Sequence, residues 1–226
     1  MNIELVVFDI AGTTVIDKGN INEAFRKAFS NAGYDVDIVD VDMVMGYRKI
    51  DAVKIILDKY NPHDNGNTQL ADVIHNDFTK NMVTFYQEAK DLTPMPFAEE
   101  VFEQLRQLNI KIALNTGFTK VITDAVLHKI GWNTSPLIDT VISSDEVPEG
   151  RPHPHMIRKI MERLNIDDTK KVAKIGDTKV DIEEGQNSGC GLVVAVTTGA
   201  YTRDQLEQYH PDYIIDSLRQ LPTLIH

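Results

Sequence analysis

The chain has 226 residues, and 34 acidic side chains outnumber 23 Lys and Arg side chains to give a formal net charge of −11. This charge predicts that nucleic acids and anionic membranes are not partners, because the field of the protein would repel them. The single cysteine, Cys190, excludes an internal disulfide and favours a reducing cytoplasm, and we expect it to be buried. No apolar run is long enough to cross a membrane and the N-terminus lacks a signal-peptide pattern, so we expect a soluble cytoplasmic protein.

The first expected element is a short strand. Leu5 to Phe8 is an apolar run that is too short for a helix and is bounded by turn residues, which predicts a buried strand. Asp9 ends this run, at the position where open α/β sheets bind their ligands. Taken alone, Asp9 could equally be a structural turn residue, so its role depends on what later segments bring to it.

A helical stretch follows from about residue 16 to residue 93. Its first helix begins at Asn20 or Asn22 and ends before Gly33, and two further helices are expected over 50–60 and 68–89. No strand signal interrupts them. We therefore predict an all-helical cap domain over residues 16–93, inserted after the first strand.

The rest of the chain alternates between helices and strands. The expected helices cover 97–108, 119–130, 154–164 and 180–188, and the expected strands cover 111–114, 137–142, 172–175, 192–196 and 213–215. Alternation of this kind predicts an α/β fold with a Rossmann-like parallel sheet and helices on both faces. We assign residues 1–15 and 94–226 to this catalytic core.

Four predicted strands end in reactive residues: Asp9, Asn115-Thr116-Gly117, Ser143-Ser144-Asp145 and Gly176-Asp177. Parallel strands place these ends on one edge of the sheet. Thr116 and Asp177 could each be simple helix caps, but four such ends in succession favour a site.

A metal site is predicted at the same edge. Asp177 and Asp181 are four residues apart and share one side of a helical turn, and Asp9 joins them. Carboxylate oxygens in this number suit Mg²⁺. Arg151 lies in the loop Gly150-Arg151-Pro152, and its guanidinium can bridge a nucleophile and a phosphoryl oxygen. The nearby His153 and His155 lack a third nitrogen or sulfur ligand, so we interpret them as packing or solvent-facing residues.

These motifs resemble those of the haloacid dehalogenase superfamily of aspartyl-nucleophile hydrolases, and they occur in the family's order: Phe8-Asp9-Ile10-Ala11-Gly12-Thr13-Thr14, Asn115-Thr116-Gly117, Gly150-Arg151-Pro152, and Gly176-Asp177-Thr178 with Asp181. The resemblance implies that Asp9 attacks phosphorus to form an aspartyl-phosphate. It also implies a phosphoryl-binding set and a magnesium-binding set. The first comprises Thr116, Gly117, Arg151 and the Ala11-Gly12 turn, and the second comprises Asp9, the Ala11 carbonyl and Asp177, with Asp181 in support.

Ala11 stands where most phosphatases of this superfamily carry an acidic residue that protonates the leaving alkoxide. Asp-x-Ala-Gly-Thr-Thr is instead similar to the motif of phosphonoacetaldehyde hydrolases, the phosphonatases, whose leaving group is carbon. Met45-Gly46-Tyr47-Arg48-Lys49-Ile50-Asp51 resembles their cap motif and places Lys49 at the position that forms an imine with the substrate. Lys49 could alternatively be a cap cation that steers a phosphate. Ala52 and Phe118 depart from the family pattern of histidine and tyrosine.

We therefore expect a magnesium-dependent hydrolase that acts on a small phosphonate such as phosphonoacetaldehyde. A phosphatase for a small phosphorylated metabolite is the alternative, and a non-catalytic phospho-ligand-binding protein is the alternative of another class. The Gly-Asp-Thr motif disfavours a 2-haloacid dehalogenase. We expect four apolar cap residues to belong to the hydrophobic core: Phe78, Met82, Phe85 and Tyr86. The alternative is that they form the face of a homodimer.

Overall fold

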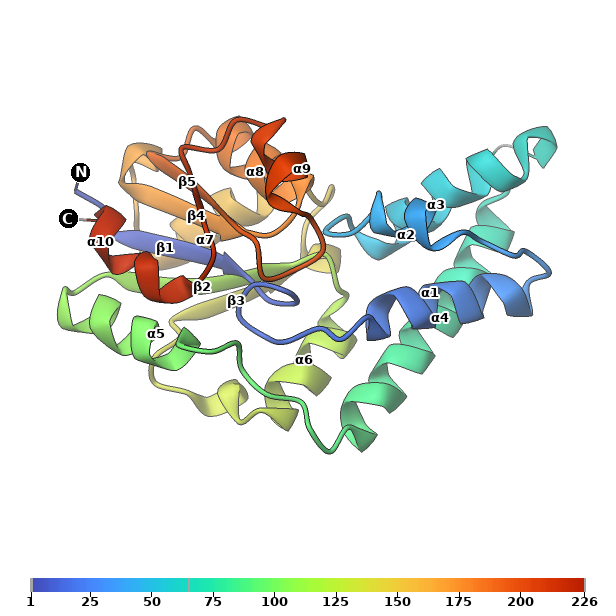
Figure 1. Cartoon of the computed structure of the whole chain (residues 1–226), viewed down its shortest axis with the longest axis horizontal. Coiled ribbons are helices and arrows are strands. Elements are labelled where there is room, and N and C mark those ends of the chain that lie inside the picture. Colours follow the sequence, from blue (N-terminus) through green and yellow to red (C-terminus); the bar gives the residue numbers. More distant parts are fainter. Residues whose placement is uncertain (1, 65, 226) are drawn as a thin grey trace.

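The computed structural model describes residues 2–64 and 66–225. Its centre is a six-stranded parallel sheet in the order β3-β2-β1-β4-β5-β6 (Figure 1). The strands are β1 (Leu5–Asp9), β2 (Lys111–Thr116), β3 (Thr140–Ser143), β4 (Val172–Gly176), β5 (Leu192–Val196) and β6 (Tyr213–Ile215). The predicted α/β class with a parallel sheet is confirmed.

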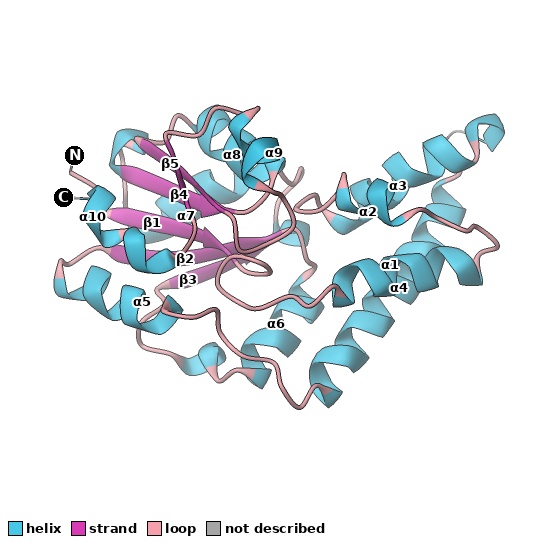
Figure 2. Cartoon of the chain, viewed as in Figure 1, coloured by secondary structure: helices cyan, strands magenta, loops and turns pink. Residues whose placement is uncertain are grey.

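Ten α-helices surround and extend this sheet in the described part of the chain (Figure 2). They are α1 (Asn20–Asn31), α2 (Ile38–Asp42), α3 (Lys49–Tyr60), α4 (Thr68–Glu88), α5 (Ala98–Gln107), α6 (Lys120–Lys129), α7 (His155–Leu164), α8 (Lys179–Ser188), α9 (Arg203–Glu207) and α10 (Pro222–Ile225). No helix in the described ranges is both long and apolar enough to span a membrane.

Alternating side chains of the central strand β1 pack on opposite faces of the sheet. Phe8 belongs to the core cluster on the α5 side, where its ring lies 5.1 Å from that of Phe102. Leu5 and Val7 belong to the other cluster, with Ile157 of α7. The side chains of β1 alternate between the two faces of the sheet, and packed residues cover both faces. Every residue of β1 is therefore buried, and the strand is apolar except at Asp9.

Helices α1 to α4 lie to one side of the sheet, between β1 and α5 in the chain (Figure 1). Their packing centres on α1 against α4, where the rings of Phe25 and Phe78 are 4.3 Å apart. Met82 and Tyr86 are buried in the same cluster, and Phe85 is partly buried against it. These side chains therefore belong to the hydrophobic core, which was the preferred expectation. No strand occurs in the described residues of 16–93.

The chain enters and leaves this helical segment through two connections that run side by side. Val15 and Pro94 form an antiparallel bridge. Beside it, the Ile16 amide donates to the Thr93 carbonyl at 3.2 Å and the Met95 amide donates to the Thr14 carbonyl at 2.8 Å. Our proposed boundaries at 15/16 and 93/94 fall within this pair of connections.

Three local expectations need correction. Strand β3 begins at Thr140 rather than Leu137, because the Asp139 carboxylate accepts the Ile112 amide at 2.8 Å and holds the preceding residues in a turn. The short helix α2 was missed; it begins after Asp37, whose side chain accepts the Val39 amide at 2.9 Å. Helix α9 was also missed, and it begins with a capping box of Thr202 and Gln205.

Cys190 is buried, as expected, with 9% of its surface exposed. Burial raises the pKa of its thiol to about 12, so the thiolate needed for nucleophilic or redox chemistry is scarce at neutral pH.

Candidate active site

The carboxyl ends of the central strands meet at Asp9. Asp9 on β1 is in register with Asn115 on β2, and Phe8 is in register with Ile175 on β4, the residue before Gly176. The motif residues that follow β2 and β4 are therefore brought to the same edge although they are far apart in the sequence.

Three buried carboxylates form a cluster at this edge. Asp9, Asp177 and Asp181 each offer an oxygen, and these oxygens lie within 4.8 Å of one another. Burial raises the pKa of Asp9 and Asp177, and the mutual repulsion of the carboxylates adds to this effect. A hard divalent cation bound among these oxygens would offset the repulsion between the buried carboxylates, so the donor set fits a metal site.

Asp177 is held from two sides. Its Oδ1 accepts the Thr13 hydroxyl at 2.9 Å, and its Oδ2 accepts the Ala200 amide at 2.8 Å. Gly12 and Gly199 leave room for it, since a Cβ on Gly199 would lie 1.9 Å from Asp177 Oδ2. Gly12 also has φ +85°, a conformation that favours glycine. The loop at Gly199 and Ala200 was not identified from the sequence.

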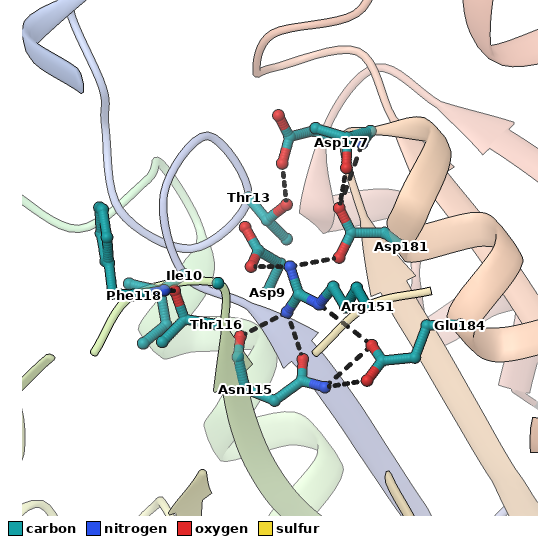
Figure 3. Close-up of polar contacts among 12 residues, drawn as sticks. Asp9, Ile10, Thr13, Asn115, Thr116, Phe118, Arg151, Asp177, Asp181 and Glu184 are labelled. Atoms are coloured by element: carbon teal, nitrogen blue, oxygen red, sulfur yellow. Dashed lines mark hydrogen bonds and ion pairs between the residues drawn. The ribbon is translucent and has the colours of Figure 1, made fainter. Parts of the chain in front are cut away.

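Arg151 lies at the centre of a buried polar network (Figure 3). Its Nη1 is 2.6 Å from Asp9 Oδ1 and 2.9 Å from Asp181 Oδ1, and its Nε is 3.1 Å from Glu184 Oε2. Its Nη2 donates to the Asn115 carbonyl at 2.7 Å. Burial alone would lower the pKa of Arg151, but the three carboxylates outweigh burial and raise it. Arg151 is thus a permanent charge that orients Asp9.

Two further members of this network, Lys174 and Glu184, were not predicted. Lys174 Nζ lies 2.9 Å from Asp181 Oδ1 and donates to Asn115 Oδ1 at 2.8 Å. Both Glu184 carboxylate oxygens accept from Asn115 Nδ2 at 2.9 Å. Signals for both residues existed: Lys174 interrupts an otherwise apolar strand, and Glu184 follows Asp181 by three residues on one helix face.

A cavity of about 230 Å³ opens in front of Asp9, between the sheet edge and the helical segment. Its lining includes most of the site residues predicted from the sequence, namely Asp9, Ala11, Gly12, Lys49, Thr116, Gly117 and Asp177. Asp181 and Arg151 are not among the described lining residues. The predicted role of Arg151 in holding a phosphoryl group therefore stays a prediction, while its contact with Asp9 is observed.

Lys49 begins α3 and extends into this cavity with only 3% of its surface exposed. Its ammonium nitrogen lies 5.3 Å from the ring centroid of Phe118 and 5.6 Å from that of Phe25. Burial lowers the pKa of Lys49 to about 8, although the charge of Asp9 opposes this shift. The Lys49 ammonium thus lies near two aromatic rings in a cavity that Asp9, Asp17 and Asp177 also line, and Ala52 is fully buried.

The loop before Lys49 lies directly on the sheet edge. The Lys49 amide donates to the Gly117 carbonyl at 3.2 Å, and a Cβ on Gly117 would lie 2.3 Å from the Tyr47 carbonyl oxygen. Arg48 Nη1 donates to the Pro148 carbonyl at 2.9 Å, and a Cβ on Gly150 would lie 2.6 Å from Arg48 Cβ. The glycines of two motifs therefore permit the close approach that seats Lys49.

His153 and His155 face solvent and form a surface cluster with Glu149. His155 Nε2 is 3.1 Å from Glu149 Oε2, and His153 Nε2 is 3.7 Å from Glu149 Oε1. Glu149 and His153 are exposed and His155 is partly buried, and this group is separate from the buried carboxylates.

Comparisons with known proteins agree with this geometry. A family model described as haloacid dehalogenase-like hydrolase matches residues 3–189. The chain is 34% identical over 207 residues to phosphonoacetaldehyde hydrolase of Parabacteroides distasonis (85% of this chain, 75% of the relative), and 29% identical over 260 residues to that of Bacillus cytotoxicus (100% and 96%). Its fold is similar to a crystal structure of a phosphonoacetaldehyde hydrolase-like protein from Oleispira antarctica, with a TM-score of 0.84, 22% identity and coverage of 100% and 92%.

Proposed function

Because the chain belongs to the haloacid dehalogenase-like hydrolases, and within them to the phosphonatase-like branch, we propose that it breaks the carbon–phosphorus bond of a small phosphonate aldehyde such as phosphonoacetaldehyde. The observation that carries this proposal is Lys49. It is a buried lysine in the same cavity as Asp9, with a pKa lowered to about 8.

A lysine must be neutral to attack an aldehyde. With a pKa near 8, roughly a tenth of Lys49 is neutral at pH 7, against about one copy in a few thousand for an ordinary lysine. The Lys49 amine adds to the aldehyde carbon, and loss of water then gives an iminium. This cationic group accepts the electron pair of the carbon–phosphorus bond, so the leaving carbon becomes an enamine.

Asp9 receives the phosphoryl group in this proposal. Its carboxylate is aligned by Arg151 at 2.6 Å, which leaves the other oxygen to attack phosphorus. Water then hydrolyses the aspartyl-phosphate to inorganic phosphate, and hydrolysis of the protonated enamine frees Lys49. Ala11 fits this chemistry because no leaving alkoxide has to be protonated.

Asp9, Asp177 and Asp181 would hold the magnesium ion, with the Ala11 carbonyl as a further oxygen ligand. Bound there, magnesium would offset the negative charge of the phosphoryl oxygens. Thr116 and Gly117 line the cavity beside Asp9 and are proposed to contact the phosphoryl group.

We also propose that residues 16–93 act as a cap domain that closes on a core of residues 1–15 and 94–226. The paired connections at Val15 and Pro94 are the proposed hinge. The closed arrangement would keep Lys49 in the cavity that Asp9 lines and exclude water. A homodimer through the cap remains a prediction.

Trapping tests the proposal. The protein is incubated with phosphonoacetaldehyde and sodium borohydride, and the expected result is loss of phosphate release with a reduced adduct on Lys49, found by peptide mass spectrometry. Lys54→Ala, which removes an exposed lysine from the same helix, is the matched control and should still form the adduct. Absence of an adduct in the wild type would overturn the iminium mechanism. Removal of divalent cations with EDTA should abolish phosphate release, and added Mg²⁺ should restore it.

A second candidate is a phosphatase for a small phosphorylated metabolite. Ala52 and Phe118, both buried, support it because they replace the polar residues that the phosphonatase pattern carries beside the lysine. Phosphate release from phosphate esters, with kcat unchanged by Lys49→Ala, would favour this candidate. Membership in a hydrolase family sets aside the non-catalytic interpretation.

A further inference from the structure

The cavity contains more acidic side chains than the proposed roles use. Asp9, Asp17, Asp42 and Asp177 all line it. Asp9 is the proposed nucleophile and Asp177 belongs to the carboxylate cluster. Asp42 is exposed, and its Oδ1 accepts a hydrogen bond from the side-chain Nδ2 of Asn22 at 2.8 Å. Asp17 remains as an acid with no role in the proposed mechanism.

Asp17 lies in the loop between the hinge at Val15 and helix α1. Its Oδ1 accepts the Asn20 amide at 3.1 Å, and the residue is half-buried. Burial raises the pKa of Asp17, while hydrogen bonds from backbone amides and the charge of Lys49 act in the opposite direction. The ionisable groups that interact with it are Lys49 from α3 and Tyr86 from α4. A carboxyl in this setting can both donate and accept a proton.

The proposed chemistry needs such a group. The carbonyl oxygen of the aldehyde must leave as water, which requires a proton donor, and the iminium must later be hydrolysed, which requires a base. Ala52 and Phe118 carry no ionisable group, and neither does Ala11. Among the described lining residues, Asp17 and Asp42 are the acids that neither the nucleophile nor the metal cluster claims, and Asp17 is the half-buried one and interacts with Lys49.

We infer that Asp17 is the acid–base residue that transfers protons as the Lys49 iminium forms and is hydrolysed. This inference rests on the proposed function and extends it. The neutral Lys49 amine forms a carbon–nitrogen bond with the aldehyde carbon, and the amine proton moves to the former carbonyl oxygen to give a carbinolamine. The Asp17 carboxyl then donates a proton to that hydroxyl, the carbon–oxygen bond breaks, and water leaves. In hydrolysis, the Asp17 carboxylate takes a proton from the attacking water.

Asp17→Asn is the appropriate test, because an asparagine side-chain oxygen still accepts the Asn20 amide and keeps the start of α1, while the transferable proton is lost. With phosphonoacetaldehyde and borohydride, adduct formation on Lys49 should be slowed by about 10²–10⁴-fold. Asp42→Asn, from the same cavity, should form the adduct at the wild-type rate. Asp17→Glu should recover part of the rate, because it restores a carboxyl.

The outcomes separate this inference from the function on which it rests. If the wild type forms no adduct, the proposed function fails. If the wild type forms the adduct and Asp17→Asn forms it equally fast, with the same pH dependence, the role of Asp17 is overturned and the iminium mechanism stands. Circular dichroism and thermal melting of each variant establish that it is folded, and if Asp17→Asn is unfolded, the Asp17→Glu rate and its pH profile decide.

Discussion

Two buried cations near Asp9 lie in different electrostatic settings. Arg151 lies within 3.1 Å of three carboxylates, which raise its pKa and keep it charged. Lys49 lies against the rings of Phe25 and Phe118, and burial lowers its pKa to about 8. The difference shows how a residue's surroundings set its role: Arg151 is a constant charge that positions Asp9, whereas Lys49 can lose its proton and react.

The largest expected effect comes from changing Lys49 while keeping its charge. Lys49→Arg leaves a cation in the cavity, but a guanidinium does not deprotonate and cannot form an imine. We expect kcat for phosphonoacetaldehyde to fall on the order of 10⁴-fold or more, measured as phosphate release. Lys54→Arg on the same helix is the control. Comparable kcat values for Lys49→Arg and the wild type would contradict a covalent lysine.

The same comparison predicts a large loss of stability at Arg151. Arg151→Met leaves Asp9, Asp181 and Glu184 buried without their shared partner, so the free energy of unfolding should fall by about 3–5 kcal/mol in urea at pH 7. Arg163→Met, at an exposed pair with Glu146, should cost about 1 kcal/mol or less. Lys49→Met should leave stability unchanged or higher, because it removes a charge that burial disfavours. If Lys49→Met lowered the free energy of unfolding as much as Arg151→Met does, the proposed distinction between the two cations would fail.

The pH profile of the chemical reactivity of Lys49 sharpens the distinction further. Because the pKa of Lys49 is about 8, the amine is mostly protonated at pH 7 and mostly neutral at pH 9. The rate at which acetic anhydride acetylates Lys49, a reaction of the neutral amine that needs no proton from Asp17, should therefore rise about tenfold from pH 7 to pH 9 and then level off. Arg151 stays charged throughout this range and contributes no inflection. A profile that is flat or falls between pH 7 and pH 9 would argue against a titrating lysine.

The smallest expected effect concerns the contact that seats the loop before Lys49. A methyl group on Gly150 would press on Arg48 Cβ at 2.6 Å, so Gly150→Ala should displace the loop. At a cost of about 1 kcal/mol, kcat/KM should fall about fivefold.

A double-mutant cycle supplies the control for this contact. Arg48→Gly removes the Cβ that the added methyl group would meet, so Gly150→Ala should cost less in that background. Equal losses in both backgrounds would show that the glycine acts in some other way.

Much of the fold could be predicted because periodicity is a local property. The strand that ends at Asp9, the helix that begins near Asn20 and the alternation after Pro96 are all visible in the order of apolar and polar residues. The short helices α2 and α9 were missed because five residues are too few to show a helical period. Each begins at a side-chain cap instead. The start of β3 was misplaced because it depends on a tertiary contact: the Asp139 carboxylate accepts a hydrogen bond from the Ile112 amide on the neighbouring strand.

The candidate site divides in the same way. Asp9, Thr116 and Asp177 could be predicted as site residues because reactive groups at successive strand ends meet at one edge of a parallel sheet, and Arg151 could be predicted from its motif loop. Lys174 and Glu184 were not found, since their significance depends on Asn115 and Asp181 lying beside them. Asp17 appears in the sequence as an ordinary loop residue, and the cavity alone brings it near Lys49.

By itself, the sequence determined the alternating α/β order, the reactive strand ends and the missing acid at Ala11, because these depend on residue type and spacing along the chain. The tertiary structure alone decided which buried charges are paired. Arg151 and Lys49 are both cations in the sequence, but only the packed interior places one among carboxylates and the other against aromatic rings. A pKa depends on burial and on the distances to other charges, and these arise only when distant segments fold together.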